Sequence, residues 1–420
     1  MEDWKEYKLG DCVEAVIDNR GKSAPTKPLG EFPLLEINSI GGYYPNYSVI
    51  RKYVDKVTYS TWFRSGHPIC GDILVPTVGT IGIISIMDNH KACIAQNLIA
   101  LRTKKDISNI FIYYFLKSPI VKKQLINLDI GGVQPSIKVP HLLNLSISLP
   151  EKDIQHKIAS ILSSLDDKIE VNRKINENLE QQAQALFKSW FVDFEPFKDQ
   201  PFVESELGMI PKGWRVGTLD EIGDVIGGST PSKAKPEYYT DNGIAWLTPK
   251  DLSISNAKFT SNGEIDITPE GYNSCSTKLM PKGSVLFSSR APIGYITIAK
   301  NEICTNQGFK SVVPGYAGTA FIYCYLKYAT PDIENMATGS TFKEASGSLM
   351  KSLQVVMAPK EVLDSFEECL KPIFAEQECL EDESRRLAEL RDTLLPRLMS
   401  GELKVQNSDL INEMLEKGIR

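Results

Sequence analysis

Apolar residues recur at every seventh position along two long polar stretches of the chain. The stretch that follows Pro150 contains neither proline nor glycine until Pro196. An apolar repeat of about 3.5 residues on a charged helix is typical of a coiled-coil seam. The pattern therefore predicts two long helices. Their seam positions are Ile158, Leu165, Asn172, Leu179 and Leu186 in the first helix, and Phe366, Ile373, Leu380, Leu387 and Leu394 in the second.

A helix over 151–191 would extend roughly 60 Å at 1.5 Å per residue. That is longer than a domain of about 150 residues is wide, so such a helix needs a partner beyond its own domain. We expect the two helices to pair antiparallel, as two copies related by a two-fold axis would. In the alternative, each helix packs only on its own domain.

Two residues interrupt the regular pattern of these helices. Asn172 is polar at a seam position, where an asparagine fixes register or orientation at a cost in stability. Pro372 is expected to kink or interrupt the second helix near its start, because proline lacks the backbone N–H that the helix uses.

Outside the helices, the chain alternates short β-type runs with Gly, Pro, Ser and Thr turns. One compact helix is expected near 108–117, and another near 319–328. This mixture predicts α/β domains. The β-type runs are Ile81–Met87, Leu142–Leu149, Tyr295–Ala299 and Leu353–Met357.

The chain also repeats itself at a shift of about 210 residues. FIYYFLK at Phe111–Lys117 returns as FIYCYLK at Phe321–Lys327, and the opening WKEYKLGD from Trp4 is similar to WRVGTLDE from Trp214. GDILVPTVGTIG aligns with GSVLFSSRAPIG, and further segments align around Gln96 and Gln307. Four colinear matches indicate a tandem duplication.

The repeat and the helices together predict a pseudo-two-fold symmetric pair of mixed α/β domains joined by an antiparallel coiled coil. The predicted segments are a first domain over 1–150, a first helix over 151–195, a linker over 196–213, a second domain over 214–359, a second helix over 360–403 and a tail over 404–420.

Charge follows the same division. The whole chain has a net charge of −6, with 24% charged and 42% hydrophobic residues. Counting Lys and Arg against Asp and Glu gives +4 for 1–150, −3 for 151–200, zero for 201–360 and −7 for 361–420. The chain is not a strongly basic nucleic-acid binder. If it binds DNA, we expect a partner to supply much of the phosphate neutralisation.

Several function classes lack their sequence signals. No apolar stretch approaches the roughly 20 residues of a membrane span, and the opening MEDWKEYKLGD has no signal-peptide pattern, so we expect a cytoplasmic protein. The eight scattered cysteines are expected to be buried free thiols, and the four histidines form no metal motif. P-loop, dinucleotide and nucleophile-elbow motifs are also missing. We therefore predict no catalytic residues, no metal and no cofactor.

Polar loops at matching places in both repeats are the candidate functional elements. Each combines glycine, which permits close backbone approach, with side chains that read base edges or hold phosphates. Any single loop could equally be an ordinary solvated turn. The candidate DNA contacts are Arg20, Lys22, Thr77, Gln134, Ser136 and Lys138 in the first domain, and Ser229, Thr230, Lys233, Ser289, Arg290, Thr341 and Lys343 in the second.

The tandem layout, the two openings, the helix sequence LPEKDIQHKIASILSSLDDKIEVNRKINENLEQQAQALFKSWF and the ending LRDTLLPRLMSGEL resemble the specificity subunit of type I restriction–modification systems, the HsdS family. The likeness spans residues 4–405. It departs from the family's usual helix opening at Ile154–Gln155, and in the second helix at Lys371–Pro372.

The resemblance implies that each globular domain is a target recognition domain and that the helices form a spacer. It further implies a bipartite double-stranded DNA site, two methyltransferase (modification) subunits and restriction (nuclease/translocase) subunits as partners, and no catalysis by this chain. Segments near Trp190–Phe191 and Leu394–Leu398 are candidates for partner docking or ordinary core.

Two alternatives differ in class. One is an enzyme that acts on DNA by itself, which would need a cofactor motif. The other is a non-catalytic scaffold of two modules on a coiled coil that does not bind DNA by itself.

Overall fold

The computed structural model describes residues 4–21, 23–127, 135–255, 257–290, 292–339 and 343–405. The chain divides into two compact units. Unit 1 contains Met1–Val171 and Glu383–Arg420, and unit 2 contains Asn172–Asp382. Both boundaries fall inside the two long helices, so each unit holds one globular domain and a part of each helix.

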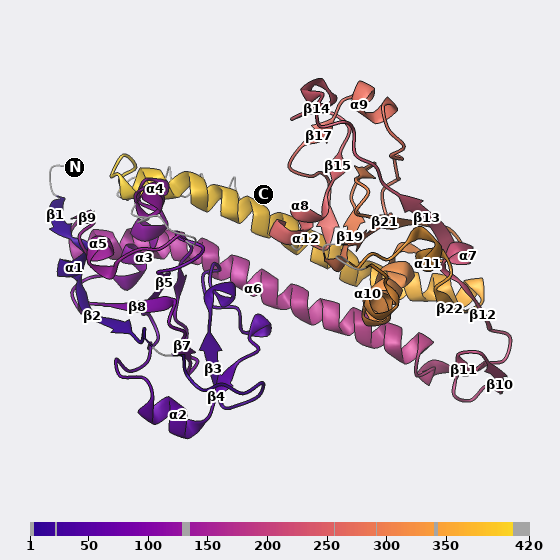
Figure 1. The fold of residues 1–420 in the computed structure, drawn as a ribbon, viewed down its shortest axis with the longest axis horizontal. Coiled ribbons are helices and arrows are strands. Elements are labelled where there is room, and N and C mark those ends of the chain that lie inside the picture. Colours follow the sequence, from indigo (N-terminus) through magenta and orange to yellow (C-terminus); the bar gives the residue numbers. More distant parts are fainter. Residues whose placement is uncertain are drawn as a thin grey trace. The chain divides into compact units, whose positions relative to one another are not determined.

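The two long helices are α6 (Lys152–Phe191) and α12 (Lys360–Met399), each of 40 residues (Figure 1). Helix α12 passes through Pro372 without interruption, so the expectation of a break there was wrong. Pro372 is exposed. The carbonyl that loses its helical hydrogen bond to the proline can therefore be satisfied by water.

Within each unit the two helix segments run antiparallel. In unit 1, Asp166 of α6 forms an ion pair with Arg391, and Lys168 lies 3.2 Å from Glu383, which precedes Arg391 on α12. In unit 2, Gln377 Nε2 donates to the carbonyl of Asn176 at 3.2 Å. The ring centroids of Phe191 and Phe366 lie 4.9 Å apart. Phe191 follows Asn176 on α6, whereas Phe366 precedes Gln377 on α12, as an antiparallel pair requires.

The globular domain of unit 1 is built on a four-stranded antiparallel sheet of order β2-β8-β5-β6, with a smaller sheet β4-β3-β7 and a pair β1-β9. The elements are β1 (Lys5–Lys8), α1 (Leu9–Cys12), β2 (Val13–Asp18), β3 (Phe32–Leu35), β4 (Tyr53–Val54), α2 (Lys56–Thr61), β5 (Ile73–Pro76), β6 (Ser85–Ile86), β7 (Cys93–Ile94), β8 (Leu98–Thr103), α3 (Asn109–Lys117), α4 (Pro119–Asn127), α5 (Val139–Leu143) and β9 (Ser146–Leu149).

The globular domain of unit 2 repeats this plan with a five-stranded sheet of order β13-β21-β18-β19-β16. A parallel pair β15-β20 matches β3-β7 of unit 1, and β12-β22 matches β1-β9. The elements are β10 (Phe202–Ser205), β11 (Gly208–Pro211), β12 (Arg215–Thr218), α7 (Leu219–Ile222), β13 (Gly223–Gly227), β14 (Tyr239–Thr240), β15 (Trp246–Leu247), α8 (Pro249–Ser255), β16 (Phe259–Thr260), β17 (Asp266–Ile267), α9 (Pro269–Asn273), β18 (Val285–Ser289), β19 (Ile293–Ala299), β20 (Cys304–Thr305), β21 (Lys310–Pro314), α10 (Thr319–Met336), α11 (Gly347–Lys351) and β22 (Gln354–Met357).

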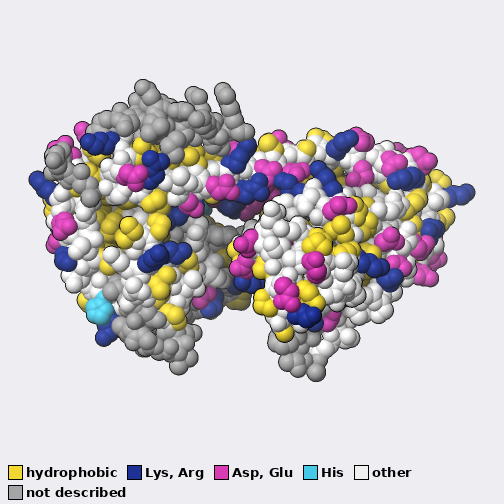
Figure 2. All heavy atoms as spheres, turned by 90° about the horizontal axis from the view of Figure 1, so that it is seen from above, with side chains coloured by type: hydrophobic (Ala, Val, Ile, Leu, Met, Phe, Trp, Pro, Cys, Tyr) yellow, Lys and Arg dark blue, Asp and Glu magenta, His cyan; other side chains and the backbone are white. Residues whose placement is uncertain are grey.

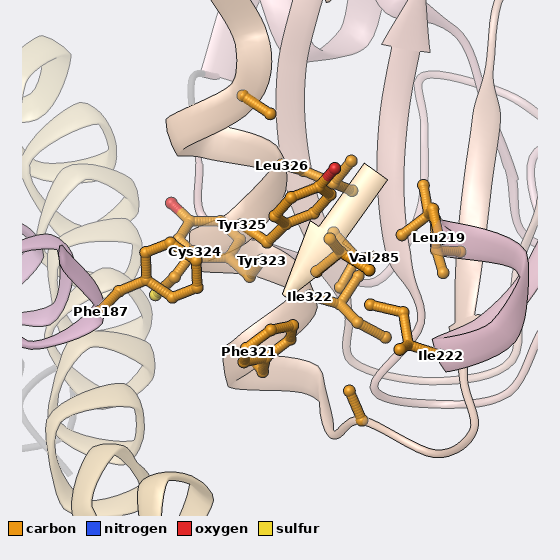
Figure 3. Packing of buried hydrophobic residues seen from close by; sticks show 14 of the residues in the cluster. Phe187, Leu219, Ile222, Val285, Phe321, Ile322, Tyr323, Cys324, Tyr325 and Leu326 are labelled. Carbon is orange, nitrogen blue, oxygen red and sulfur yellow. The ribbon is translucent and has the colours of Figure 1, made fainter. Parts of the chain in front are cut away.

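The main core of each unit joins its helix segments to the compact helix of its own domain. In unit 1, Leu165 and Leu394 pack in one buried cluster with Phe111 of α3. In unit 2, Phe187 of α6 lies beside the side chains of α10, with its ring 5.5 Å from that of Phe321 (Figure 3). The long helices therefore pack both on each other and on the domain within each unit.

Three local expectations need correction. The run Ile81–Met87 is a strand only at Ser85–Ile86, because Gly82 lies at a turn with φ of 84°. The run Leu142–Leu149 begins inside helix α5, which has Pro140 in its first turn. Only the end of the run, β9, is a strand. All eight cysteines are free, but Cys70, Cys369 and Cys379 are exposed, since they lie on turns or outward helix faces.

Candidate nucleic-acid interface

Four loops of unit 1 meet at one end of its main sheet, where β2 and β5 end and β8 begins. The amide of Thr77 donates to the carbonyl of Asn97 at 2.9 Å, and the amide of Ile137 donates to the carbonyl of Thr77 at 2.8 Å. Val78 and Ser136 form a β-bridge. These bonds hold the loop after β5, the β7–β8 turn and the segment before α5 together.

The loops border a cleft of about 570 Å³ with a mixed polar and apolar lining. Its lining includes Asn19 and Ser23 from the loop after β2, Gly79 from the loop after β5, and Gln96 and Asn97 from the β7–β8 turn. Amide and hydroxyl side chains gathered in a concave surface can donate to and accept from base edges.

Unit 2 brings the equivalent four loops together at the equivalent end of its sheet. The amide of Ser229 donates to the carbonyl of Thr305 at 3.0 Å, and the amide of Ser289 donates to the carbonyl of Gly308 at 2.8 Å. The amide of Ala345 donates to the carbonyl of Ser289 at 2.9 Å. The duplication therefore preserves the convergence of these loops, and not only the sheet that supports them.

The predicted contact residues of unit 1 differ in accessibility. Arg20 and Lys138 are exposed and Ser136 is half-buried. Thr77 is buried, and its hydroxyl lies 3.3 Å from the carbonyl of Asn97, so its side chain holds the loop in place instead of projecting from it. Lys22 and Gln134 lie outside the described residues.

The predicted contact residues of unit 2 show the same division. Lys233 is exposed, and Ser229 and Thr230 are half-buried. Ser289 is fully buried, and its hydroxyl donates to the carbonyl of Gly308 at 3.1 Å. Lys343 donates to the carbonyl of Glu334 at 3.1 Å. Thr341 lies outside the described residues.

Both predicted arginines are paired with carboxylates at the loop surface. Arg20 hydrogen-bonds Asp18 through Nε and Nη2, which lowers the pKa of that carboxyl. Arg290 lies 3.6 Å from Glu344, with about a third of its side chain exposed. On the face that Figure 2 shows, Lys and Arg side chains are interspersed with Asp and Glu. The carboxylates pre-orient the arginines but reduce the net attraction for phosphate.

The sequence interpretation did not select two glutamines that the structure places among these loops. Gln96 and Gln307 are both exposed and occupy the same turn in the two units. Thr230 donates a hydrogen bond to Oε1 of Gln307. A usable signal was present, because both residues lie in segments that align in the repeat.

The seam residues lie inside the units. Ile158, Leu165, Leu380, Leu387, Leu394 and Phe366 are buried, Asn172 is fully buried, and Leu179, Leu186 and Ile373 are half-buried. Of the segments considered for partner docking or ordinary core, Phe191, Leu394, Leu395 and Leu398 are buried core, and Trp190 is half-buried.

Gln155 shows what the unusual opening of α6 does. Its side chain is buried and accepts a hydrogen bond from the amide of Ser108, immediately before α3, at 3.1 Å. Glu367 of α12 does the same for α10, accepting from the amides of Ala320 and Phe321 at 3.1 and 2.9 Å. Each long helix thus caps the compact helix of one domain.

In the described part of the chain, no cluster of three or more His, Cys, Asp or Glu side chains is arranged to hold a metal ion. None of the helices in the described ranges has the length and apolar character needed to cross a bilayer.

Comparison with known proteins places this fold in a class. A family model described as the type I restriction modification DNA specificity domain matches residues 1–181 and 211–364. The chain therefore belongs to the specificity subunits of type I restriction–modification systems.

Individual relatives agree. The chain is 29% identical over 334 residues to the HindI specificity subunit of Haemophilus influenzae, covering 65% of this chain and 72% of that protein. It is 26% identical over 423 residues to the putative MjaX specificity subunit of Methanocaldococcus jannaschii, covering 96% and 95%. The crystal structure of a type I S subunit from M. genitalium has the same fold, with a TM-score of 0.53 at 18% identity over 94% of this chain and 96% of that one.

Proposed function

We propose that this chain binds a bipartite double-stranded DNA site, with one half-site read by the loops of each unit, and performs no bond chemistry itself. The main support is the convergence of the same four loops at the same sheet end in both units. Within a family of specificity subunits, a duplicated set of polar loops fits a site made of two separate parts.

The proposed contacts are the accessible loop residues. They are Arg20, Ser136, Lys138 and Gln96 in unit 1, and Ser229, Thr230, Lys233, Arg290, Lys343 and Gln307 in unit 2. Lys22, Gln134 and Thr341 stay predictions at the same loops. Arginine reads guanine and glutamine reads adenine through paired hydrogen bonds in the major groove.

The long helices are proposed to act as a spacer that sets the gap between the half-sites. Half-sites about one helical turn apart, roughly 34–36 Å, face the same side of a duplex. Inserting four residues, about one helical turn, into both helices should change the gap of the recognised site but not the half-site sequences. An unchanged gap in that variant would argue against the spacer.

Methyltransferase and restriction subunits are the proposed protein partners, and they would supply the chemistry and the cofactors. The helical segments are acidic and the globular segments carry net charges of only +4 and zero, so we propose that these partners supply much of the positive charge that DNA binding requires.

The decisive experiment is single-molecule methylation mapping of a host with and without this gene. A split methylated motif that disappears with the gene would support the proposal and define the target. A methylome that does not change would count against it. If the chain shows no DNA affinity that responds to salt and to site sequence, the scaffold alternative would be favoured instead.

A further inference from the structure

Lys258 joins three elements of unit 2 through hydrogen bonds. It precedes strand β16 and its side chain is only 7% exposed. Its ammonium lies 2.8 Å from Glu180 of α6 and 2.7 Å from Oε1 of Gln377 of α12. Its carbonyl accepts from the amide of Ile298 in β19 at 2.7 Å. One residue therefore connects the main sheet to both long helices.

The surroundings of Lys258 hold it in one position. Its amide donates to Oε1 of Glu381 at 2.8 Å. Its ammonium lies 3.5 Å from the centroid of the Phe374 ring and 4.3 Å from that of Tyr323. The Tyr323 hydroxyl donates to Glu180 at 3.2 Å. Burial would raise the pKa of Glu180, but the Lys258 ammonium, together with Lys327 and Gln184, outweighs burial and lowers it.

A second lysine binds the same edge of the domain to α12. Lys300 follows β19, and its amide donates to the carbonyl of Thr260 in β16 at 2.8 Å. Its ammonium lies 2.6 Å from Asp382 and 3.3 Å from Glu378. Strands β16 and β19 are thus attached to the helices by two charged contacts.

The described residues of unit 1 form the same plan without a strand that matches β16. Its main sheet ends at β6, whereas the sheet of unit 2 is extended by β16. Removing a lysine and a carboxylate from water is costly, and apolar residues of similar volume often serve stability as well or better. Stability alone is therefore a weak reason for Lys258. Directional bonds to three elements do restrict how the domain can rotate on the helices.

We propose that Lys258, with Glu180, Gln377 and Glu381, fixes the orientation of the second recognition domain on the helix pair and so confines recognition to one gap length. These are positioning residues that do not touch DNA. The inference rests on the proposed function, because gap length has meaning only if each unit reads one half-site.

The test compares methylation maps of hosts that produce the complete system with Lys258→Met, Glu180→Gln or the double variant. Lys250→Met is the matched control, because Lys250 pairs with Glu264 at 2.7 Å with both side chains 67% exposed. The readout is the methylated fraction of sites whose half-sites are separated by the native gap, relative to the methylated fraction of sites whose gap is one base pair shorter or longer. Both half-site sequences should persist in every variant.

Lys258→Met should lower the preference for the native gap by about tenfold, the scale expected when hydrogen bonds to a charged group are lost. Lys250→Met should leave it unchanged. The double variant should recover thermal stability, because no buried charge is left unpaired. Its gap preference should nevertheless stay relaxed.

Two results would overturn the proposal. One is a wild-type gap preference in Lys258→Met, or in Glu180→Gln where Lys258→Met does not fold. The other is recovery of gap preference together with stability in the double variant, which would show a purely structural role. A wild-type chain that directs no split motif would instead defeat the proposed function.

Discussion

At equivalent positions of the long helices, unit 1 has a buried ion pair and unit 2 has apolar side chains. In unit 1, Asp166 is 3% exposed, pairs with Arg391, accepts from the Tyr114 hydroxyl at 2.7 Å and lies 3.6 Å from Lys117. At the heptad shift of 208 residues, Asp166 corresponds to Phe374 and Arg391 corresponds to Ala183. Both Phe374 and Ala183 are buried in the core of unit 2.

The difference shows which contacts define the shared fold. In both units the compact helix packs on the two long helices through aromatic residues, as Phe111 does in unit 1 and Phe321 in unit 2. Buried charges are particular to each unit, at Asp166 in one and at Lys258 in the other. Apolar packing therefore builds the common layout, and the ionic contacts distinguish the two ends.

The largest effect is expected from breaking the ionic contact of unit 1. Asp166→Ala removes the buried carboxylate that Arg391, Lys117 and the Tyr114 hydroxyl share, although Arg391 keeps its contact with Asp392, and should lower the free energy of unfolding by about 3–5 kcal/mol. Chemical denaturation measures this change. Asp167→Ala, at the exposed neighbouring position, is the control. A loss below about 1 kcal/mol for Asp166→Ala, the scale of a surface pair, would contradict the assignment.

The same comparison suggests that the ion pair of unit 1 can be replaced by the apolar side chains that unit 2 has at the equivalent positions. Asp166→Phe combined with Arg391→Ala copies Phe374 and Ala183 into unit 1. Since well-packed apolar residues can replace buried ion pairs at little cost, the double variant should recover most of the stability that Asp166→Ala loses. Failure to recover would show that the space around α3 cannot accept the ring.

A smaller effect is expected at the loops, and it should be confined to one half of the DNA site. Arg290→Ala should weaken discrimination at one position of the second half-site by about 1–3 kcal/mol. Arg20→Ala should do the same in the first half-site only. Binding to a panel of single-base variants checks both. Equal weakening across all sequences would reassign either arginine to phosphate contact.

The smallest effect is expected where one unit uses glutamine and the other glutamate. Burial raises the pKa of Glu367 above its usual value of 4.5, so its contribution to stability declines as pH rises from 4.5 through the raised pKa. Glu367→Gln, which copies Gln155, should remove that decline and change stability by about 1 kcal/mol or less. Melting temperature against pH measures it, and an identical pH profile would contradict the prediction.

Much of the architecture could be predicted from sequence because its signals are periodic or repeated. The heptad spacing located both long helices, since an apolar stripe on a long helix must be buried. The repeat of FIYYFLK located the compact helices, now α3 and α10. The helix does not break at Pro372 as we expected. An exposed proline costs a long helix one hydrogen bond, and the tertiary contacts of the rest of α12 keep it helical.

The candidate interface was harder to predict, because residue type does not reveal accessibility. Thr77 and Ser289 have suitable hydroxyls, yet both are turned inward to hold loops. Gln96 follows the apolar run Cys93–Ala95, yet a turn places it at the surface, and Gln307 lies in the equivalent turn. Asp166 and Lys258 look like ordinary charged residues of an exposed helix and loop, since only tertiary packing buries them.

The interleaving of the chain has a consequence for synthesis on the ribosome. The core of unit 1 includes Leu387, Leu394, Leu395 and Leu398, which are translated after all of unit 2. Other members of that core, such as Phe111 and Leu165, are made earlier and lack these four side chains until the whole of unit 2 has been made. The unit whose translation begins first is therefore the one whose core can be completed only after the other unit has been made.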